Sequence, residues 1–254
     1  MSIGYNPSVA SPNNLTMCLD AGNPRSYSGS GTTWISASSS NNATLVNGPT
    51  YTSSGVTSYF TFDGVDDTAS TSMAISTTPA LGNWSYEVWT SITAWPTAVS
   101  PPNVYNNSTR AGVLLGATYY GGAALYWYGN SSGNACTMYA FLRGNDAYRN
   151  TSGYAMALNT VYQFTMVNDY SGNLISLYVN GVFYASTPAA TQEYNSGLIS
   201  GLTIGLALPQ VDGGGEANYS RYPGRIYSAK IYSSALTAAQ VAQNFNATRG
   251  RYGV

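Results

Sequence analysis

The sequence predicts an all-β protein, an antiparallel β-sandwich of the jelly-roll type with one short C-terminal helix. Three features of the 254 residues predict this fold class. Short runs alternate between apolar and polar residues, which is the period of a half-buried strand. Clusters of Gly, Asn, Ser and Thr separate these runs, as turns do. Only one segment has helical periodicity, and many short strands joined by turns are typical of sandwiches.

The clearest strand is predicted over Trp84–Ile92. One face carries the large apolar side chains of Trp84, Tyr86, Val88 and Ile92. The other face carries the smaller or polar side chains of Ser85, Glu87 and Ser91. Trp89 interrupts this polar face, so we expect something to cover the second face in part.

A hairpin is predicted further along the chain. Residues 161–167 form an alternating strand, and Leu174–Val179 form the next. Asn180-Gly181 then separates the second run from residues 182–185, and Asn-Gly favours a type I′ turn because both residues tolerate positive φ. Further strands are expected over residues 15–19, 59–62, 112–116, 124–128, 137–142, 202–204 and 224–232.

Residues 235–246 have a helical pattern. Thr237 and Gln240 have the spacing of a capping box, in which each side chain binds the other residue's backbone N–H. Val241 and Phe245 fall on one face, with Leu236 just before the cap. A lone short helix near the end of a β chain is expected to pack as a lid on the sheets.

The chain is predicted to form one domain. Long polar loops are expected at residues 26–42, 96–110, 129–134 and 189–198, and none has the composition of an interdomain linker. We assign residues 1–14 to an N-terminal arm and residues 15–254 to the jelly-roll domain.

Charge is scarce, and this excludes several classes of protein. Lys and Arg total 9, Asp and Glu total 10, and together they make 7% of the residues. Too few cations are present to neutralise a nucleic-acid backbone. The chain has no His, so it has neither a Ser-His-Asp system nor a His-ligated zinc. Hydrophobic residues still make 44% of the chain, enough for a core.

Membrane insertion and secretion are not expected. No apolar run is long enough to span a bilayer, and the first residues lack the pattern of a signal peptide. We therefore expect folding in a reducing cytoplasm, with Cys18 and Cys136 as free, buried thiols. A disulfide between them is the alternative.

Several segments in order resemble one family. They are residues 19–27 (LDAGNPRSY), 59–67 (YFTFDGVDD), 84–89 (WSYEVW), 177–182 (LYVNGV) and 224–237 (GRIYSAKIYSSALT). Together they resemble the concanavalin A-like jelly roll of the laminin-G type, from about residue 15 to the C-terminus. The resemblance implies a β-sandwich whose last strand leads into a short helix.

The ends of the chain resemble a narrower group. An Asn-Pro-Ser leader before residues 19–27, and the tail over residues 243–253 (QNFNATRGRYG), look like those of virion structural proteins of tailed bacteriophages, particularly phages of marine and cyanobacterial hosts. This resemblance implies location in a virion assembled in the host cytoplasm. It also implies virion proteins, either capsid or tail, as partners and many copies per particle.

The family often binds calcium, and the sequence offers a candidate site. Asp63, Asp66 and Asp67 place three carboxylates in one turn, and calcium takes six to eight oxygen ligands. The alternative is a turn in which Asp63 and Asp66 accept backbone N–H groups. Where many relatives carry acidic residues after Gly-x-Ile, this chain has Ser228 and Ala229. The loop at residues 212–216 is a second, weaker candidate. No other cofactor is expected.

The family also often binds glycans, which calls for exposed aromatic rings. Candidate contact residues for a carbohydrate or a partner protein are Tyr119, Tyr120, Tyr126, Trp127 and Tyr128. The alternative is that half of these rings lie in the core and the rest meet a neighbouring subunit, because Tyr and Trp are enriched at interfaces.

Catalysis is not expected. Related folds include glycoside hydrolases with a Glu-x-Asp-x-Glu strand, and glycoside hydrolysis needs two carboxylates across the scissile bond. The chain has no such run, and Glu87, Glu193 and Glu216 are isolated in the sequence.

The function expected from these observations is that of a bacteriophage virion structural protein, most specifically a capsid decoration protein that stabilises the head. Low charge allows many copies to lie side by side with little repulsion. The expected assembly contacts are Tyr5, Arg249, Arg251 and Tyr252. The alternatives are a tail-associated adhesin that binds host glycans and a lectin-like carbohydrate-binding module. Neither nucleic acid nor membrane is an expected partner.

Overall fold

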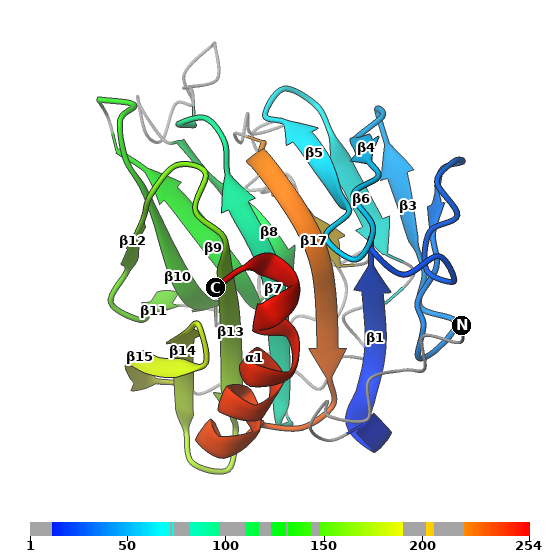
Figure 1. Cartoon of the computed structure of the whole chain (residues 1–254). Helices are drawn as coiled ribbons and strands as arrows, with labels where there is room; N and C mark the ends of the chain where they lie inside the picture. The colour runs from blue at the N-terminus through cyan, green and yellow to red at the C-terminus, as the bar shows by residue number, and fades with distance from the viewer. Residues whose placement is uncertain are drawn as a thin grey trace, which may run out of the picture.

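Two antiparallel sheets form the body of the protein, with a helix on the outside of one of them (Figure 1). The computed structural model describes residues 12–71, 73, 82–96, 110–116, 123–130, 132–143, 148–189, 202–205 and 221–254. Within these ranges, no helix combines the length and the apolar character that crossing a membrane requires.

The first sheet has eight strands among the described residues. In spatial order they are β15 (Val182–Pro188), β14 (Leu174–Val179), β13 (Tyr162–Asp169), β7 (Trp84–Ile92), β17 (Pro223–Tyr232), β5 (Tyr59–Asp63) and β4 (Thr50–Thr52). The remaining strand, β1 (Leu15–Asp20), pairs with the second half of β17, from Ser228 to Tyr232. The first half of β17 pairs with β5 on the same side, so one long strand binds two partners in succession.

The second sheet has nine strands among the described residues. Their order is β11 (Tyr148–Asn150), β10 (Cys136–Arg143), β9 (Ala123–Gly129), β8 (Arg110–Gly116), β16 (Thr203–Ile204), β6 (Thr68–Thr71), β3 (Ala43–Val46) and β2 (Thr33–Trp34). The strand β12 (Tyr154–Met156) pairs with the start of β10. Before β1, Pro12–Asn14 form a 3₁₀ turn; residues 1–11 of the predicted arm lie outside the described residues.

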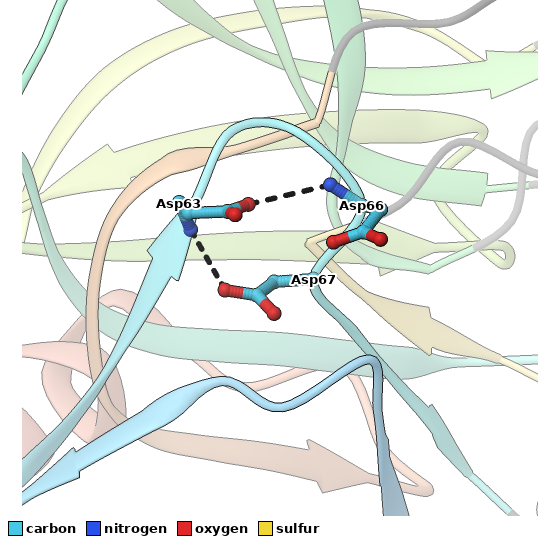
Figure 2. A group of neighbouring side chains, drawn as sticks. All are labelled: Asp63, Asp66 and Asp67. Atoms are coloured by element: carbon cyan, nitrogen blue, oxygen red, sulfur yellow. Dashed lines mark hydrogen bonds between the residues drawn. The ribbon is translucent and has the colours of Figure 1, made fainter.

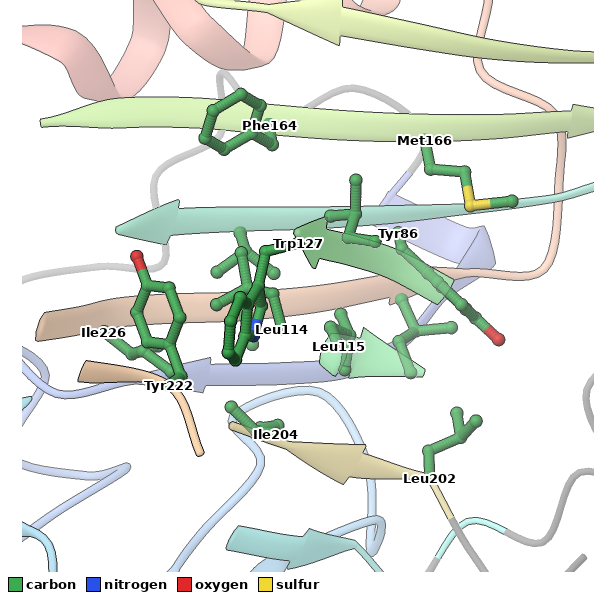
Figure 3. Packing of buried hydrophobic residues seen from close by; sticks show 14 of the residues in the cluster. Tyr86, Leu114, Leu115, Trp127, Phe164, Met166, Leu202, Ile204, Tyr222 and Ile226 are labelled. Carbon is green, nitrogen blue, oxygen red and sulfur yellow. The ribbon is translucent and has the colours of Figure 1, made fainter. Parts of the chain in front are cut away.

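The main core lies between the sheets. Figure 3 shows Tyr86, Phe164 and Ile226 of the first sheet facing Leu114, Leu115 and Trp127 of the second. These side chains are buried. Each large apolar side chain that leaves water contributes about 1.5–3 kcal/mol to folding.

The observed architecture confirms the prediction of an all-β sandwich with one C-terminal helix. Every strand expected from alternation is present. The strands that the sequence analysis missed are short: β2, β3, β4, β6, β11 and β12 have two to four residues. Several lie in Ser- and Thr-rich segments, where too few apolar residues alternate to show a period. The hairpin turn is also confirmed, since Asn180 and Gly181 have φ values of 51° and 78°.

The helix α1 (Ala238–Tyr252) begins with the predicted capping box. The Thr237 side chain accepts from the Gln240 backbone, and the Gln240 side chain accepts from the Thr237 backbone. The helix continues beyond residue 246 and ends where Gly253 adopts the left-handed conformation at φ 72°. Residues 249–252 therefore form the last turn of the helix rather than a separate tail.

α1 lies on the outer face of the first sheet, across β7 and β17 (Figure 1). The ring of Trp89 stacks on the ring of Phe245 with a centroid distance of 5.6 Å and an interplanar angle of 9°. Tyr252 lies on the same indole at 4.4 Å. The predictions that the outer face of β7 is covered and that the helix forms a lid are both confirmed.

Candidate functional site

A group of tyrosines lies on the outer face of the second sheet, on the hairpin of β9 and β10. Tyr126 lies opposite Tyr139, and Tyr128 lies opposite Thr137. Residues two apart on a strand point to the same face, so these four side chains share one surface, which we call the tyrosine face. The helix α1 covers the other sheet, on the opposite side of the sandwich (Figure 1).

One end of this surface is closed and the other is open. Val113, Ala124 and Phe141 form a small buried cluster on the same side of the sheet. Tyr126 is half-buried and stacks on Phe141 at 5.4 Å. Tyr128, two residues further along, is 39% exposed. The surface therefore opens to solvent along β9, with aromatic rings at its open end.

The connection between β11 and β12 passes over part of the tyrosine face. A Cβ atom at Gly153 would lie 2.3 Å from Cγ2 of Thr137 and 2.5 Å from Cε1 of Tyr139. Only glycine permits so close an approach. The hydroxyl of Tyr184, on β15, donates to the Gly153 carbonyl oxygen at 2.8 Å. Burial raises the pKa of Tyr139, and a hydrogen bond with Thr137 opposes the shift.

The predicted aromatic contacts divide between surface and core. Tyr126 and Tyr128 reach the surface, whereas Trp127 points inward and is fully buried among core residues. Alternation along β9 requires this, because a strand cannot present three consecutive side chains on one face. Trp127 is therefore corrected from a contact residue to a core residue. Tyr119 and Tyr120 lie outside the described residues.

Tyr139 and Thr137 were not among the predicted site residues. Pairing β9 with β10 through the intervening turn would have placed Tyr139 beside Tyr126. This position of Tyr139 follows from the sequence only if the pairing register of β9 and β10 is known.

The three aspartates predicted as a calcium site lie in one turn between β5 and β6. Figure 2 shows Asp63, Asp66 and Asp67 converging, and one carboxylate oxygen from each lies within 4.8 Å of the others. Oδ1 of Asp63 accepts from the backbone of Val65 at 2.7 Å and of Asp66 at 3.3 Å. Oδ2 of Asp67 accepts from the backbone of Asp63 at 2.9 Å.

These hydrogen bonds account for the turn without a metal. Asp63 and Asp66 are the acceptors expected in the alternative interpretation; in the structure, Asp63 and Asp67 have that role. Burial raises the pKa of Asp67; its bond from Asp63 opposes the shift, and the charges of Asp63 and Asp66 add to it. The donor set is of the hard-oxygen type that suits calcium. The second candidate loop, residues 212–216, lies outside the described residues.

The last turn of α1 folds back on its own domain. Arg251 forms two hydrogen bonds of 2.8 Å with the carboxylate of Asp20, and Tyr252 packs on Trp89. Arg249 remains exposed. The prediction that this turn contacts other subunits therefore loses its support for Arg251 and Tyr252, whose polar and aromatic groups are engaged within the chain. Tyr5 lies outside the described residues.

The acidic residue of β7 has an internal partner. Glu87 is 1% exposed and its Oε1 accepts from Nζ of Lys230 at 2.6 Å. Cys18 and Cys136 are both buried and neither forms a disulfide, which confirms that prediction. Glu193 and Glu216 lie outside the described residues.

The two packed antiparallel sheets with the outer C-terminal helix define a concanavalin A-like β-sandwich. A family model described as the concanavalin A-like lectin/glucanases superfamily matches residues 63–242. The chain belongs to this superfamily. No curated protein matches the chain.

Solved structures of the same fold include enzymes and toxins. A Trypanosoma rangeli sialidase in complex with a difluoro-nononic acid is 16% identical with a TM-score of 0.60, over 94% of this chain and 33% of the sialidase. The receptor binding domain of a botulinum neurotoxin C/D mosaic serotype is 14% identical with a TM-score of 0.60, over 92% of this chain and 51% of that domain. The chain therefore spans about a third to a half of these neighbours, and the likeness concerns the fold.

Proposed function

We propose that the protein is a lectin-like module that binds carbohydrate on the tyrosine face. The arrangement of Tyr126, Tyr128 and Tyr139 around Thr137 carries this proposal. A sugar ring offers apolar C–H faces and polar hydroxyl edges. Tyrosine supplies a flat apolar ring and a hydroxyl that donates or accepts, so it complements both.

The surroundings of these tyrosines suit a binding surface. The buried cluster of Val113, Ala124 and Phe141 fixes one end of it, and the carbonyl of Gly153 with the Tyr184 hydroxyl borders another side. Binding sites generally combine aromatic walls with a few placed polar groups. The four side chains of the tyrosine face carry no charge at neutral pH, which favours neutral sugars over acidic ones.

The comparisons support this proposal indirectly. The superfamily is described by its lectins and glucanases. Among the structural neighbours, one is a receptor binding domain and another is a sialidase solved with bound sialic acid. At identities of 14% and 16%, these likenesses carry the fold and leave the ligand to be established on this chain.

A glycan array followed by calorimetry with the best sugar tests the proposal. Tyr128→Ala is expected to weaken binding about tenfold, since losing about 1.4 kcal/mol of stacking corresponds to that factor. Tyr170→Ala is the matched control, because Tyr170 is similarly exposed but lies at the turn between β13 and β14. The proposal fails if no glycan binds, or if both variants bind as the unchanged protein does.

A second candidate is the capsid decoration protein implied by the ends of the sequence. One observation favours it: the edge strand β15 exposes Val182 by 68%, Phe183 by 52% and Tyr184 by 42%. Adjacent exposed apolar residues on an edge strand suit contact with another protein. Antibody labelling of purified virions tests this candidate. Label spread over heads supports decoration, and label confined to tail tips supports a glycan-binding adhesin instead.

A further inference from the structure

Three polar side chains meet in the layer between α1 and the first sheet. Glu87 on β7 and Lys230 on β17 are a cross-strand pair. Oε1 of Glu87 lies 2.6 Å from Nζ of Lys230. Oε2 of the same carboxylate accepts from Nδ2 of Asn244, on α1, at 3.0 Å. One carboxylate therefore holds an amine and a carboxamide side by side.

This cluster is sealed from solvent. Lys230 is 6% exposed, Glu87 1% and Asn244 0%. Apolar side chains surround it: Leu15, Val167, Tyr178, Leu236 and Val241 belong to the same buried layer. Cys18 lies opposite Lys230 on β1, and the hydroxyl of Tyr232 lies 3.0 Å from Nδ2 of Asn244. Water, the usual competitor of an amine in attack on an amide, is excluded.

We propose that Lys230 and Asn244 condense into an intramolecular isopeptide bond, with Glu87 as the acid–base catalyst. Lys230 is the one lysine of the chain, so only one such bond to a lysine is possible. The proposal concerns the α1 layer and is independent of any ligand of the tyrosine face.

The first step is a proton transfer from Nζ of Lys230 to Oε1 of Glu87 along their hydrogen bond. Burial lowers the pKa of Lys230, but the Glu87 carboxylate outweighs burial and holds that pKa well above its usual value. The amine therefore becomes neutral only by giving its proton to Glu87 itself. A buried site favours this, because burial penalises both charged partners and not the neutral pair. The neutral form is a minor state, so the reaction is expected to be slower than folding.

The second step forms the bond. The lone pair of Nζ attacks Cγ of Asn244, and a new C–N bond forms while the carbonyl electrons move to oxygen. Glu87, in contact with both nitrogens, first delivers its proton to Nδ2 and then accepts one from Nζ. The Cγ–Nδ2 bond then breaks and ammonia leaves. Ammonia takes the remaining proton from Glu87 and departs as ammonium, so one ammonium and one ionised Glu87 balance the original ammonium group and carboxylate.

Proximity allows this reaction to proceed without an external reagent. Well-oriented groups within one molecule react as though at effective concentrations of about 10⁵ M or more. The Asn244 side chain is held by bonds to Glu87 and Tyr232, and its backbone carbonyl accepts from Thr248 at 2.8 Å. The product would join α1 covalently to β17 through a ring that spans residues 230–244.

Peptide mapping of the unchanged protein, incubated overnight after purification, tests the proposal. Trypsin cleaves after Arg225, Lys230 and Arg249. An acylated Lys230 is not cleaved, so residues 226–249 are expected as one peptide, lighter than its sequence by one ammonia. Fragmentation is expected to give no separated ions from within residues 231–243, because one backbone break does not open the ring.

Intact mass alone does not suffice, since Asn47-Gly48 and Asn180-Gly181 can also lose ammonia by forming a succinimide. The peptide map separates these events from the cross-link. If trypsin yields residues 226–230 and 231–249 from the unchanged protein, the proposal is overturned.

Two variants test the roles of Lys230 and Glu87 separately. Lys230→Arg keeps the positive charge beside Glu87 but lacks the nucleophilic amine, and it is expected to give two separate tryptic peptides. Glu87→Gln keeps the shape of the side chain but removes the acid–base group, and the fraction cross-linked is expected to fall at least tenfold. An unchanged fraction in Glu87→Gln would refute the role of Glu87. Near-ultraviolet circular dichroism of each variant checks that the fold is retained.

Discussion

Arg251 and Asp20 form a bidentate ion pair that fastens the last turn of α1 to the end of β1. Nη1 of Arg251 donates to Oδ2 of Asp20 and Nη2 donates to Oδ1, both at 2.8 Å. Nη2 and Nε of the same guanidinium also donate to the carbonyl oxygen of Val56 at 2.6 and 3.2 Å. Desolvation lowers the pKa of Arg251, but the hydrogen bonds to Asp20 outweigh it and raise that pKa above its usual value.

Replacing this guanidinium is expected to loosen the end of the helix. Arg251→Lys keeps the charge but loses the planar fork, so it should lower the free energy of unfolding by about 1 kcal/mol. Urea denaturation measures this change. Arg249→Lys is the matched control because Arg249 is exposed and its guanidinium carbon lies 6.0 Å from the ring centroid of Phe245. Equal effects of the two substitutions would contradict a specific role for the Arg251 pair.

The stacking of Phe245 on Trp89 is expected to dominate the packing of α1. Phe245→Ala removes a half-buried ring that covers Trp89. The cost should be about 2–4 kcal/mol, somewhat less than the roughly 3–5 kcal/mol of a fully buried Phe. Asn246→Ala, on the exposed side of the same turn, should change stability by less than about 0.5 kcal/mol. Thermal unfolding of both variants decides the point. A small effect of Phe245→Ala would mean that the lid is held mainly by its polar contacts.

Replacing two glycines by alanine is expected to change the stability of the protein in opposite directions. Gly181 has φ 78°, and a Cβ there would lie 2.7 Å from Cβ of Phe245. Gly181→Ala is therefore expected to cost about 1–3 kcal/mol through backbone strain and the clash with α1. Gly250 lies in α1 with nothing within 4 Å of an added Cβ, so Gly250→Ala is expected to gain about 0.5–1 kcal/mol from helix propensity. Melting temperatures that shift in the same direction would show that this interpretation of the two sites is wrong.

The aspartate turn is expected to make the stability of the protein depend on pH. The raised pKa of Asp67 means that the folded state binds this proton more tightly than the unfolded state. Protonation of Asp67 therefore contributes fully to the stability of the folded state below the unfolded pKa of about 4. This contribution is lost as pH rises through the folded pKa. Asn at this position keeps an acceptor for the Asp63 N–H and carries no charge. Asp67→Asn is expected to melt higher than the unchanged protein at about pH 7, and this advantage should shrink towards about pH 3.

The same variant tests calcium. Millimolar calcium is expected to raise the melting temperature of the unchanged protein, because a ligand of the folded state stabilises it, and to act less on Asp67→Asn. Asp169→Asn is the control, since Asp169 also caps a turn, through Gly172, but lies on β13. No response of the unchanged protein to calcium would leave the turn as a hydrogen-bonded structure alone.

The two cysteines are expected to be inert in the native protein. Burial raises the pKa of Cys136 to about 12, so its thiolate is scarce at neutral pH. Cys18 is buried between β17 and Ser36, whose hydroxyl accepts from the Cys18 backbone at 3.0 Å. A thiol reagent such as Ellman's reagent should label neither residue before unfolding and both afterwards. Rapid labelling of the native protein would reveal an opening of the sandwich.

Much of the fold could be predicted from interactions between residues that are close in the sequence. The Asn180-Gly181 turn and the Thr237 capping box lie within a few residues of their partners, so the sequence encodes them directly. The interruption of β7 by Trp89 correctly predicted a covered outer face. The short strands β2, β3 and β6 were missed, because two to four residues rich in Thr or Ala do not establish a period.

By itself, the sequence determined the fold class, the main strands, the hairpin and the helix start, since each depends on side-chain period or turn chemistry over neighbouring residues. Only the tertiary structure decided which side chains meet. It turned Trp127 inward and Tyr128 outward, paired Arg251 with Asp20, and brought Glu87, Lys230 and Asn244 into one buried cluster. Arg251 and Asp20 lie far apart in the chain, and so does Glu87 from both of its partners. Their meeting depends on strand register and on where the helix docks, which are set by the packing of the whole sandwich.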